Sequence, residues 1–526
     1  MSSQLWRTKS IDKLIAASEE PSHKLKKTLG PWSLVALGIG AIVGSGIFVL
    51  TGTAAAGEAY KVPSILHAQV LDIITSLIQY GNLSHAMMHG RPAAGPSIAI
   101  SFILVAVVCS FAGLCYAELA SMIPIAGSAY TYSYATLGEL IAWIIGWDLI
   151  LEYAVSNVAV AVGFSGYFTS LLGAMGIRLP PQLTQPIWEN GVRTGAWFNL
   201  PGFLVVMILT VLLVRGIRES AETNNIMVVI KLAAILIFII AGGMLVKPAN
   251  WHPFAPHGFA GIITGGAIVF FTYIGFDSVS TASEEAINPQ RDIPFGIIGS
   301  LIVCAVLYVG VAVVLLGMMK YSTFLSGEAA NAPVSYALRV LKANPWVLYA
   351  VDIGALMGML SSLLVFQYGQ TRIWFAMSRD RLLPPVFSKV HPKYQTPYAS
   401  SWIAGLVVGI PAGLVDIGAA ADLSNIGTLF AFALVALGVL VLRKKQPDRP
   451  RGFRVPFVPL FPILAVVFCG VLMLALPVET WVRFFGWMII GLLVYYYYGR
   501  KRSEFHQGTG DRGQGSVAMG GRKAVG

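Results

Sequence analysis

The residues in this chain best suited to bind a ligand lie in two glycine-rich stretches that interrupt apolar segments. The first is the run GIGAIVGSGIF at 38–48, and the second is FFTYIGFD at 270–277. A glycine cluster inside a membrane helix leaves backbone groups unpaired, which hydrocarbon tolerates only where they line a cavity or bind something. Broken helices at matching places in two halves of a membrane protein indicate a binding site near the bilayer midplane.

The two breaks offer opposite partial charges. The first offers backbone N–H groups from Val43 to Ile47 beside a helix N-terminus, which suits a carboxylate. The second offers carbonyl groups near Tyr273 to Gly275, which suit an ammonium group. Such glycines also serve close helix packing, but two breaks at matching positions favour a binding function. The candidate binding residues at the breaks are Ile42, Val43, Gly44, Ser45, Gly46, Phe271, Tyr273, Ile274 and Gly275.

Lys231 is a charged residue inside an apolar run at about 226–246. An ammonium group deep in a bilayer is costly and usually faces a polar interior, where burial lets it exchange a proton near neutral pH. The alternative is that the side chain extends to the membrane surface. Ser361 and Ser362 could pair with Lys231, although serines in apolar helices more often bond to their own backbone.

Three further side chains are candidates for contact with a ligand. Asp148 and Glu152 are four residues apart and therefore share one helix face, with Glu152 the deeper of the two. Glu152 could contact a ligand or a water, and a purely structural hydrogen bond is an equal alternative. Met359 could line a side-chain pocket, although methionine on a membrane helix usually only fills space.

The composition predicts the elements that must hold these residues. The chain has 526 residues, of which 56% are hydrophobic and 12% charged, with a mean hydropathy of +0.71. This excludes an ordinary soluble domain and predicts an all-α polytopic membrane protein with twelve transmembrane helices. The expected spans are about 33–50, 97–119, 140–173, 198–215, 226–246, 261–281, 296–319, 346–376, 399–416, 424–442, 458–475 and 480–498.

The basic residues predict the orientation of the chain in the membrane. Of its 36 Lys and Arg residues, most fall in segments that would share one side with both chain ends. Positive residues favour the cytoplasmic side, so we expect both termini in the cytoplasm and a multi-pass protein of the cell membrane, such as the bacterial inner membrane. The net charge of +11 follows from this asymmetry and does not indicate nucleic-acid binding.

Several classes of protein lack support in the sequence. There is no G-x-x-x-x-G-K-[ST] motif, which argues against an ATP-driven pump, and no HExxH motif or Cys/His cluster. We therefore expect no catalytic residues, no metal and no cofactor.

Motifs spread over most of the chain resemble one superfamily. They are GSGIF at 44–48, YAEL at 116–119, PIAGSAYTY at 124–132, YIGFD at 273–277, EE at 284–285, NP at 288–289, GQTR at 369–372 and MSRD at 377–380. Together they resemble the amino acid–polyamine–cation superfamily, most closely bacterial relatives of the cationic amino acid transporters. The resemblance implies a LeuT-like 5+5 inverted repeat, with helices 1 and 6 broken, plus two extra helices and alternating access.

The resemblance also implies roles for particular residues. In proton-coupled members a fifth-span lysine stands where sodium binds in sodium-coupled relatives, so Lys231 would be the switching cation with Ser361 or Ser362 beside it. Phe271 or its neighbours would gate the site, and Met359 would limit side-chain size. The partners implied are an amino acid substrate and membrane lipids, with a small accessory membrane protein as a further candidate.

The expected organisation has four parts and one departure from the family. Residues 1–30 form the cytoplasmic N-terminus, 31–443 the transport core, 444–500 a basic loop with helices 11 and 12, and 501–526 a disordered tail. The stretch 57–93 replaces a usually short connection. Its apolar residues recur at helical spacing, so we expect an extracellular insertion with an amphipathic helix lying at the interface or on the protein.

The implied function is secondary active import of amino acids by proton-coupled alternating access, with small neutral L-amino acids favoured over long cationic ones. Three alternatives remain open. They are a cationic amino acid uniporter or permease for Arg and Lys, an exchanger of amino acids or amines, and a nontransporting sensor.

Overall fold

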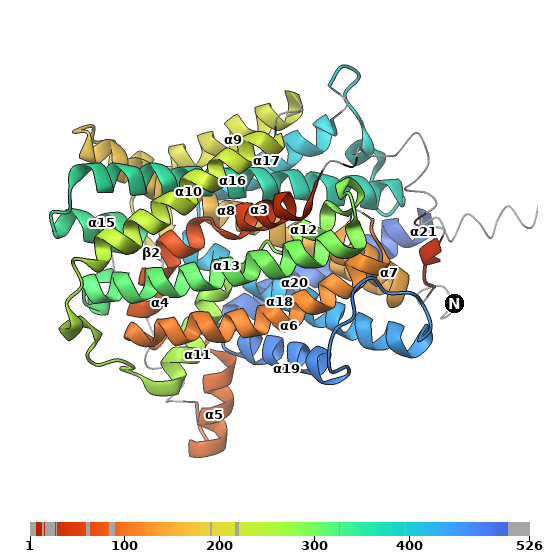
Figure 1. Cartoon of the computed structure of the whole chain (residues 1–526), viewed down its shortest axis with the longest axis horizontal. Coiled ribbons are helices and arrows are strands. Elements are labelled where there is room, and N and C mark those ends of the chain that lie inside the picture. Colours follow the sequence, from red (N-terminus) through yellow and green to blue (C-terminus); the bar gives the residue numbers. More distant parts are fainter. Residues whose placement is uncertain are drawn as a thin grey trace, which may run out of the picture.

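The computed structural model describes residues 7–12, 15, 27, 29–58, 64–83, 90–125, 127–189, 192–215, 220–325, 327–394 and 396–502. Long helices run side by side along the longest axis of the molecule (Figure 1). The strands in this part of the chain are the two-residue pair β1 (Trp188–Glu189) and β2 (Val192–Arg193), which form an antiparallel hairpin. The tail expected to be disordered lies outside the described residues beyond Arg502.

Eight described helical segments are long and apolar enough to cross a membrane. Regular helices suit the hydrocarbon interior because their backbone groups bond within the helix. The eight segments are α6 (Ile98–Met122), α8 (Glu139–Ala174), α10 (Ser220–Gly243), α11 to α12 (Gly258–Thr281), α13 (Pro289–Met318), α16 (Pro345–Arg379), α18 (Ile417–Lys445) and α20 to α21 (Val478–Arg502).

A ninth candidate span is bent. It consists of α3 (Pro31–Ile42) followed by η1 (Gly46–Leu50) and α4 (Thr51–Ala56), with a bend of 45° at the break. The bend falls at the glycine cluster that the sequence singles out. Glycine weakens a helix here because it lacks the side chain that restricts backbone freedom.

Three of the twelve expected spans form shorter apolar helices than the sequence predicts. They are α9 (Leu200–Arg215), α17 (Tyr398–Ala412) and α19 (Leu460–Leu474), with 15 or 16 residues each. At about 1.5 Å per residue they extend ~22–24 Å, less than the ~30 Å of a typical hydrocarbon core. By length alone, the described chain therefore has eight or nine spans.

The remaining helical elements are short and connect or cap the long ones. They are η2 (Ile65–His67), α5 (Val70–Tyr80), η3 (Gly95–Ser97), α7 (Ser128–Thr136), η4 (Pro181–Leu183), η5 (Pro248–Trp251), η7 (Ser283–Glu285), η8 (Tyr321–Leu325), α14 (Glu328–Asn331), α15 (Pro333–Val340), η9 (Pro385–Ser388) and η10 (Tyr495–Gly499).

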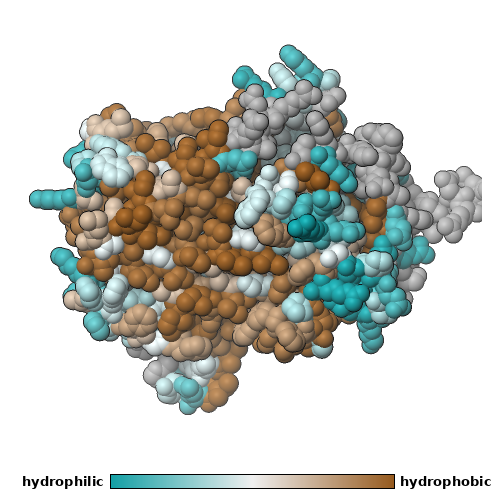
Figure 2. Space-filling view, viewed as in Figure 1, coloured by the Kyte–Doolittle hydropathy of each residue, from teal (hydrophilic) through white to brown (hydrophobic). Residues whose placement is uncertain are grey.

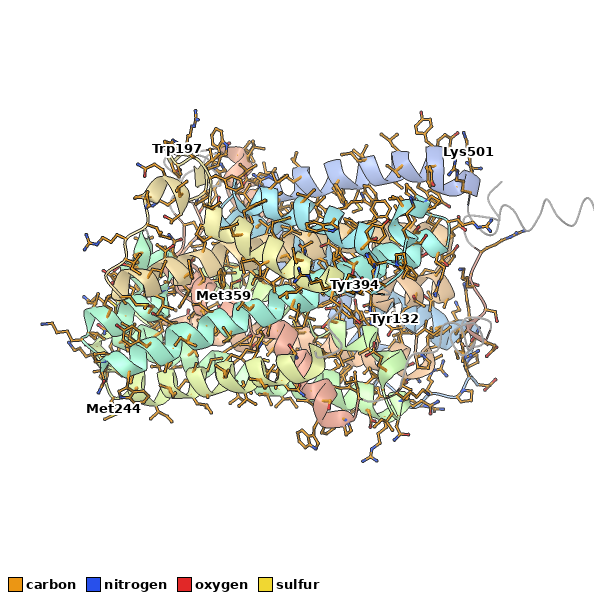
Figure 3. All side chains as sticks on the ribbon, turned by 90° about the horizontal axis from the view of Figure 1, so that it is seen from above. Tyr132, Trp197, Met244, Met359, Tyr394 and Lys501 are labelled. Carbon is orange, nitrogen blue, oxygen red and sulfur yellow. The ribbon has the colours of Figure 1, made fainter. Side chains whose placement is uncertain are left out.

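The surface has an apolar belt between two more polar ends. Figure 2 shows a broad apolar surface over the middle of the long axis. Apolar side chains of the long helices are exposed, such as Ile240 of α10 and Val306 of α13, at 69% and 68%. Trp197 and Met244 lie at one end of the molecule and Lys501 at the other (Figure 3). Residues 7–12 and α21 (Arg500–Arg502) lie at the same end (Figure 1).

The two ends of the stretch 57–93 lie side by side where it leaves the helix bundle and where it rejoins it. Backbone hydrogen bonds join Glu58 and Arg91 in both directions, at 3.1 and 2.8 Å. The buried Arg91 guanidinium also pairs with the carboxylates of Glu58 and Asp422, and Asp422 belongs to α18. Between these ends the described residues form η2 and α5, while 59–63 and 84–89 lie outside the described residues.

A buried carboxylate fastens the loop between α18 and α19 to the end of α6. Glu118 accepts hydrogen bonds from Arg443 at 2.7 and 2.8 Å and from Arg451 at 3.1 Å. It also accepts the backbone N–H of Val455 at 2.7 Å. Because Glu118 is 1% exposed, these donors replace the water that a buried carboxylate would otherwise need.

Candidate functional site

The first break separates α3 from η1 through three residues, Val43, Gly44 and Ser45. Val43 is extended, its N–H bonds to Ile39 O at 3.0 Å, and the N–H of Gly44 bonds to Ile42 O at 3.0 Å. Two of the amides expected to be free are therefore paired in this conformation. Ser45, Gly46 and Ile47 open the next helical turn, where N–H groups have no acceptor within the helix, so the possible anion site is confined to these three.

The second break follows η6 (Phe270–Tyr273). Ile274 is extended and Gly275 has φ of +120°, a conformation that side chains rarely adopt. The Gly275 carbonyl accepts the N–H of Ser278 at 3.1 Å, so it is not free, contrary to expectation. The carbonyls of Tyr273 and Ile274 accept no hydrogen bond from the described residues, which leaves these two to face a cation.

The two breaks are in direct contact, and glycine makes the contact possible. A Cβ atom on Gly46 would lie 2.8 Å from Thr272 Cα, and one on Gly275 would lie 3.0 Å from the carbonyl carbon of Ala41. Along the chain, 41 faces 275 and 46 faces 272, so the two broken segments cross in opposite directions. The breaks that the sequence separates by more than two hundred residues therefore form one place in the structure.

The ammonium group of Lys231 on α10 binds to the first break. Its Nζ lies 2.8 Å from Gly40 O, 2.8 Å from Val43 O and 2.9 Å from Ser361 Oγ. The side chain is 0% exposed, so it does not extend to the membrane surface. Ser361 in turn donates to Gly40 O at 3.0 Å.

Ser362, the neighbour of Ser361 on α16, lies against the same break. Its hydroxyl is 3.0 Å from Ala41 O, 3.2 Å from Gly40 O and 3.3 Å from Val43 O. A Cβ on Gly44 would come within 2.7 Å of this hydroxyl. The carbonyl groups that the break releases from α3 are thus met by one lysine and two serines, as buried polar groups require.

Tyr308 on α13 joins the two breaks, and the sequence analysis missed it. Its hydroxyl lies 3.0 Å from Ile42 O and 2.9 Å from Thr272 O. A single hydroxyl proton can serve only one of these acceptors at a time. The sequence shows a tyrosine within an apolar span, which could have marked it as a candidate. It does not show which other helices the tyrosine side chain contacts.

Buried carboxyl groups lie beside the second break. Tyr153 donates to Asp277 Oδ2 at 3.1 Å, and Glu152 interacts electrostatically with Asp277 and Asp148. Within the described part of the chain, both carboxyl oxygens of Glu152 and the Asp277 Oδ1 have no hydrogen-bond partner. Buried oxygens of this kind normally bind water or a ligand, so Glu152 remains a candidate for ligand contact.

The remaining predicted site residues are apolar or small. Phe271 lies in η6 and is 5% exposed, and Met359 on α16 is 0% exposed. Met359 lies between the two ends of the molecule (Figure 3). It is one residue from Gly358, where an added Cβ would lie 3.4 Å from Lys231 Cδ and 3.5 Å from Val43 O. Ser45 is buried, and its hydroxyl has no partner among the described residues.

Charged residues at the α21 end form ion pairs rather than a ligand site. Arg372 binds Glu285 at 3.1 Å, and Lys9 binds Asp380 at 2.9 Å. Tyr130 also donates to Asp380, at 2.6 Å. These contacts join α16 to η7, to α7 and to the N-terminal segment.

This architecture defines an all-helical polytopic membrane protein whose candidate site lies between two discontinuous helices. A sequence profile of the amino acid permease family matches residues 73–495. The chain belongs to the amino acid permease family, within the amino acid–polyamine–cation superfamily. Members of this family are transporters, so the chain is a transporter and not an enzyme.

Individual relatives agree with this assignment. The chain is 47% identical over 509 residues to the branched-chain amino acid permease BcaP of Bacillus subtilis, covering 96% of this chain and 100% of that protein. It is 44% identical to the methylthioribose transporter of the same organism, over 95% and 99% of the two chains. It is also 34% identical to the vacuolar cationic amino acid transporter 4 of Arabidopsis thaliana, over 84% and 68%.

Proposed function

We propose that the protein imports neutral amino acids by proton-coupled alternating access, with Lys231 as the coupling residue. The observation that carries the proposal is the set of three acceptors around the Lys231 Nζ, at 2.8 to 2.9 Å. A charged ammonium has three N–H donors and no acceptor capacity. Gly40 O, Val43 O and Ser361 Oγ therefore match its protonated form.

Loss of the proton would change this arrangement directly. A neutral amine keeps two N–H groups, so one of the three acceptors would lose its donor, and the charge that attracts the two carbonyl dipoles would disappear. Because these carbonyls belong to the break in the first span, proton release would free that segment to move. A ligand bound at the break would then be coupled to the proton through the same backbone.

The amino acid head group would bind at the two breaks. The N–H groups of Ser45, Gly46 and Ile47 suit its carboxylate, and the carbonyls of Tyr273 and Ile274 suit its ammonium group. Ile42 and Phe271 would lie against the ligand, with Phe271 as the gate. Met359 would bound the side chain and favour neutral substrates. The similarity to BcaP makes branched-chain amino acids the first to test.

The proposed topology is twelve spans in a LeuT-like 5+5 inverted repeat with two extra helices. The opposite crossing of the two breaks supports the inverted repeat, and α9, α17 and α19 supply the three short spans. The side shared by residues 7–12 and α21 would be cytoplasmic, which agrees with the excess of basic residues there.

Uptake into proteoliposomes tests the coupling. We expect an inward proton gradient to drive accumulation of leucine or alanine, and a sodium gradient to have no effect. Lys231→Ala should abolish gradient-driven accumulation, while the exposed lysine variant Lys320→Ala should keep it. Full accumulation by Lys231→Ala, or dependence on sodium, would refute the assigned role.

A second candidate substrate class follows from the methylthioribose transporter. Methylthioribose has no amino acid head group, so it would not use the charged ends of both breaks. Competition separates the two: unlabelled methylthioribose should leave leucine uptake unchanged if the proposal is right. Preference for arginine would instead favour the cationic class and make Glu152→Gln the decisive variant, while Met359→Ser should widen specificity toward arginine.

A further inference from the structure

Helix α5 differs from the long helices in its direction. In Figure 1 it projects from the side of the body, across the direction in which the long helices run. If the long helices cross the membrane, α5 lies along the membrane plane. It leaves the body on the side of the middle of the long axis that is away from α21.

One face of α5 is apolar and points away from the protein. At 3.6 residues per turn, Ile74, Leu77 and Ile78 share one side of the helix, while Gln79 lies on the other. These three side chains are 38%, 48% and 79% exposed. An amphipathic helix normally turns its apolar face toward the protein core, so this exposure requires another apolar partner.

The root of α5 is fixed to two membrane-facing elements. The Gln69 side chain donates to Thr264 Oγ1 of α11 at 2.8 Å and accepts from it at 3.2 Å. Backbone bonds join Val70 N to Leu476 O at 3.3 Å and Val478 N to Ala68 O at 3.0 Å, immediately before α20. These contacts set the direction in which the helix leaves the body.

The apolar face of α5 continues the apolar belt of the molecule. In Figure 2 the projecting segment shows apolar atoms on the side toward the middle of the long axis, next to the belt. On α20, which begins beside the root of α5, Val482 and Phe485 are 58% and 54% exposed to the same surroundings. The surface that meets lipid along α20 therefore extends onto α5.

We infer that α5 lies flat in the headgroup region of one lipid leaflet, with phospholipid acyl chains as the partner of Ile74, Leu77 and Ile78. In the proposed orientation this is the outer leaflet. Helices of this kind sit in the interface plane and bury their apolar face at the boundary between headgroups and acyl chains. Tyr80, which is 55% exposed at the far end of α5, suits the same zone because tyrosine favours membrane interfaces. The inference rests on the membrane topology and not on the substrate or on coupling.

Site-directed fluorescence in proteoliposomes tests this placement. Ile78→Cys and the matched control Gln79→Cys are labelled with a bimane maleimide, with the labelled parent protein as the blank because its four cysteines are all buried. Lipids carrying a nitroxide near the headgroup quench from the bilayer, and iodide quenches from water. We expect lipid nitroxide to quench Ile78→Cys severalfold more than Gln79→Cys, and iodide to show the reverse order.

Each other outcome overturns the inference. Equal quenching of both labels by iodide would place α5 in water. An Ile78→Cys label shielded from both quenchers would mean that protein covers this face, and recovery in nanodiscs holding one copy would identify a second copy as the cover. If Ile78→Cys fails to fold, Ile74→Cys on the same face gives the same comparison, and failure of transport in either variant would not affect the readout.

Discussion

Lys231 and Ser361 come from different helices, yet their polar atoms lie 2.9 Å apart and both bond to the carbonyl oxygen of Gly40. This triangle ties α10 and α16 to the break in the first span. The Ser361 hydroxyl accepts a hydrogen bond from Lys231 and donates one to Gly40 O, so it adds a second link between the lysine and this carbonyl. The lysine and the serine should therefore differ in importance, since only the lysine carries the charge.

Ser361→Ala should weaken uptake without abolishing it. Lys231 keeps its bonds to Gly40 O and Val43 O, so the loss is one hydrogen bond to a charged group, ~1.5–3 kcal/mol, or roughly ten- to a hundredfold in rate. Initial uptake rates under a proton gradient measure this. Ser110→Ala, which removes a hydroxyl that bonds only to its own helix, is the control and should be neutral. A loss as complete as that of Lys231→Ala would show that the hydroxyl itself is essential.

Gly46→Ala and Gly275→Ala should both damage the site. The added methyl group would press on Thr272 or Ala41, and overpacking of this kind typically destabilises by ~1–3 kcal/mol. Gly275 also has φ of +120°, so Gly275→Ala should be the worse of the two. Thermal unfolding in detergent and leucine binding measure the effects. Gly470→Ala, where a Cβ meets nothing within 4 Å, should behave like the parent, and normal binding by Gly46→Ala would contradict the close contact.

Tyr308→Phe should leave the fold intact and slow transport. The change removes only the hydroxyl that lies between Ile42 O and Thr272 O, at a cost of roughly 1 kcal/mol. Because the two acceptors belong to the two breaks, we expect substrate affinity and turnover to change together. Tyr349→Phe, whose hydroxyl makes an exposed contact of 3.5 Å, is the matched control. Equal rates for the two variants would exclude a role for Tyr308 in joining the breaks.

Glu118→Gln should release the loop between α18 and α19. The amide cannot satisfy Arg443, Arg451 and the Val455 N–H together, and breaking a buried ion pair costs about 3–5 kcal/mol. Trypsin should then cut faster after Arg451 or Arg454 in proteoliposomes opened to both sides. Glu479→Gln removes an exposed pair with Arg483, worth ~0–1 kcal/mol, and its digestion should match the parent. Unchanged cleavage of Glu118→Gln would show that the loop is held elsewhere.

Asp72 should make the attachment of α5 depend on pH. Burial raises the pKa of the Asp72 carboxyl above its ordinary value, so the docked helix binds this proton more tightly than an undocked one. Docking is therefore favoured as the pH falls through the raised pKa and is weakened above it, where the carboxylate is ionised. A bimane label at Tyr80→Cys should report a more fixed helix at lower pH. Asp72→Asn should remove the pH dependence, and a dependence that persists would assign it to another group.

The sequence predicted the family because its motifs are local patterns. The glycine breaks, the apolar runs and the lysine within one of them can be recognised from neighbouring residues alone. The superfamily resemblance is confirmed by the match to the amino acid permease family over residues 73–495. The number of spans was less secure, since α9, α17 and α19 form fewer helical turns than their apolar runs allow.

The parts of the site that could not be predicted depend on contacts between distant segments. The amides of Val43 and Gly44 were expected to be free, but a local turn pairs them. Tyr308 was missed because helical periodicity does not show which two helices a tyrosine will meet. Glu118 was seen only as part of a motif, because its three donor residues, in the end of α18 and the loop that follows, are more than three hundred residues away.

The backbone hydrogen bonds between Glu58 and Arg91 hold the two ends of the intervening stretch side by side. A segment whose two ends already sit side by side imposes no strain on the helices that flank it, whatever its length. Replacing residues 59–90 by a short turn, or by an epitope or fluorescent reporter, would keep these two ends joined. The replacement would remove the bonds of Gln69 to α11 and of Ala68 and Val70 to the segment that begins α20. The same geometry would allow insertions and deletions in this segment during evolution without a change in the helices of the transport core.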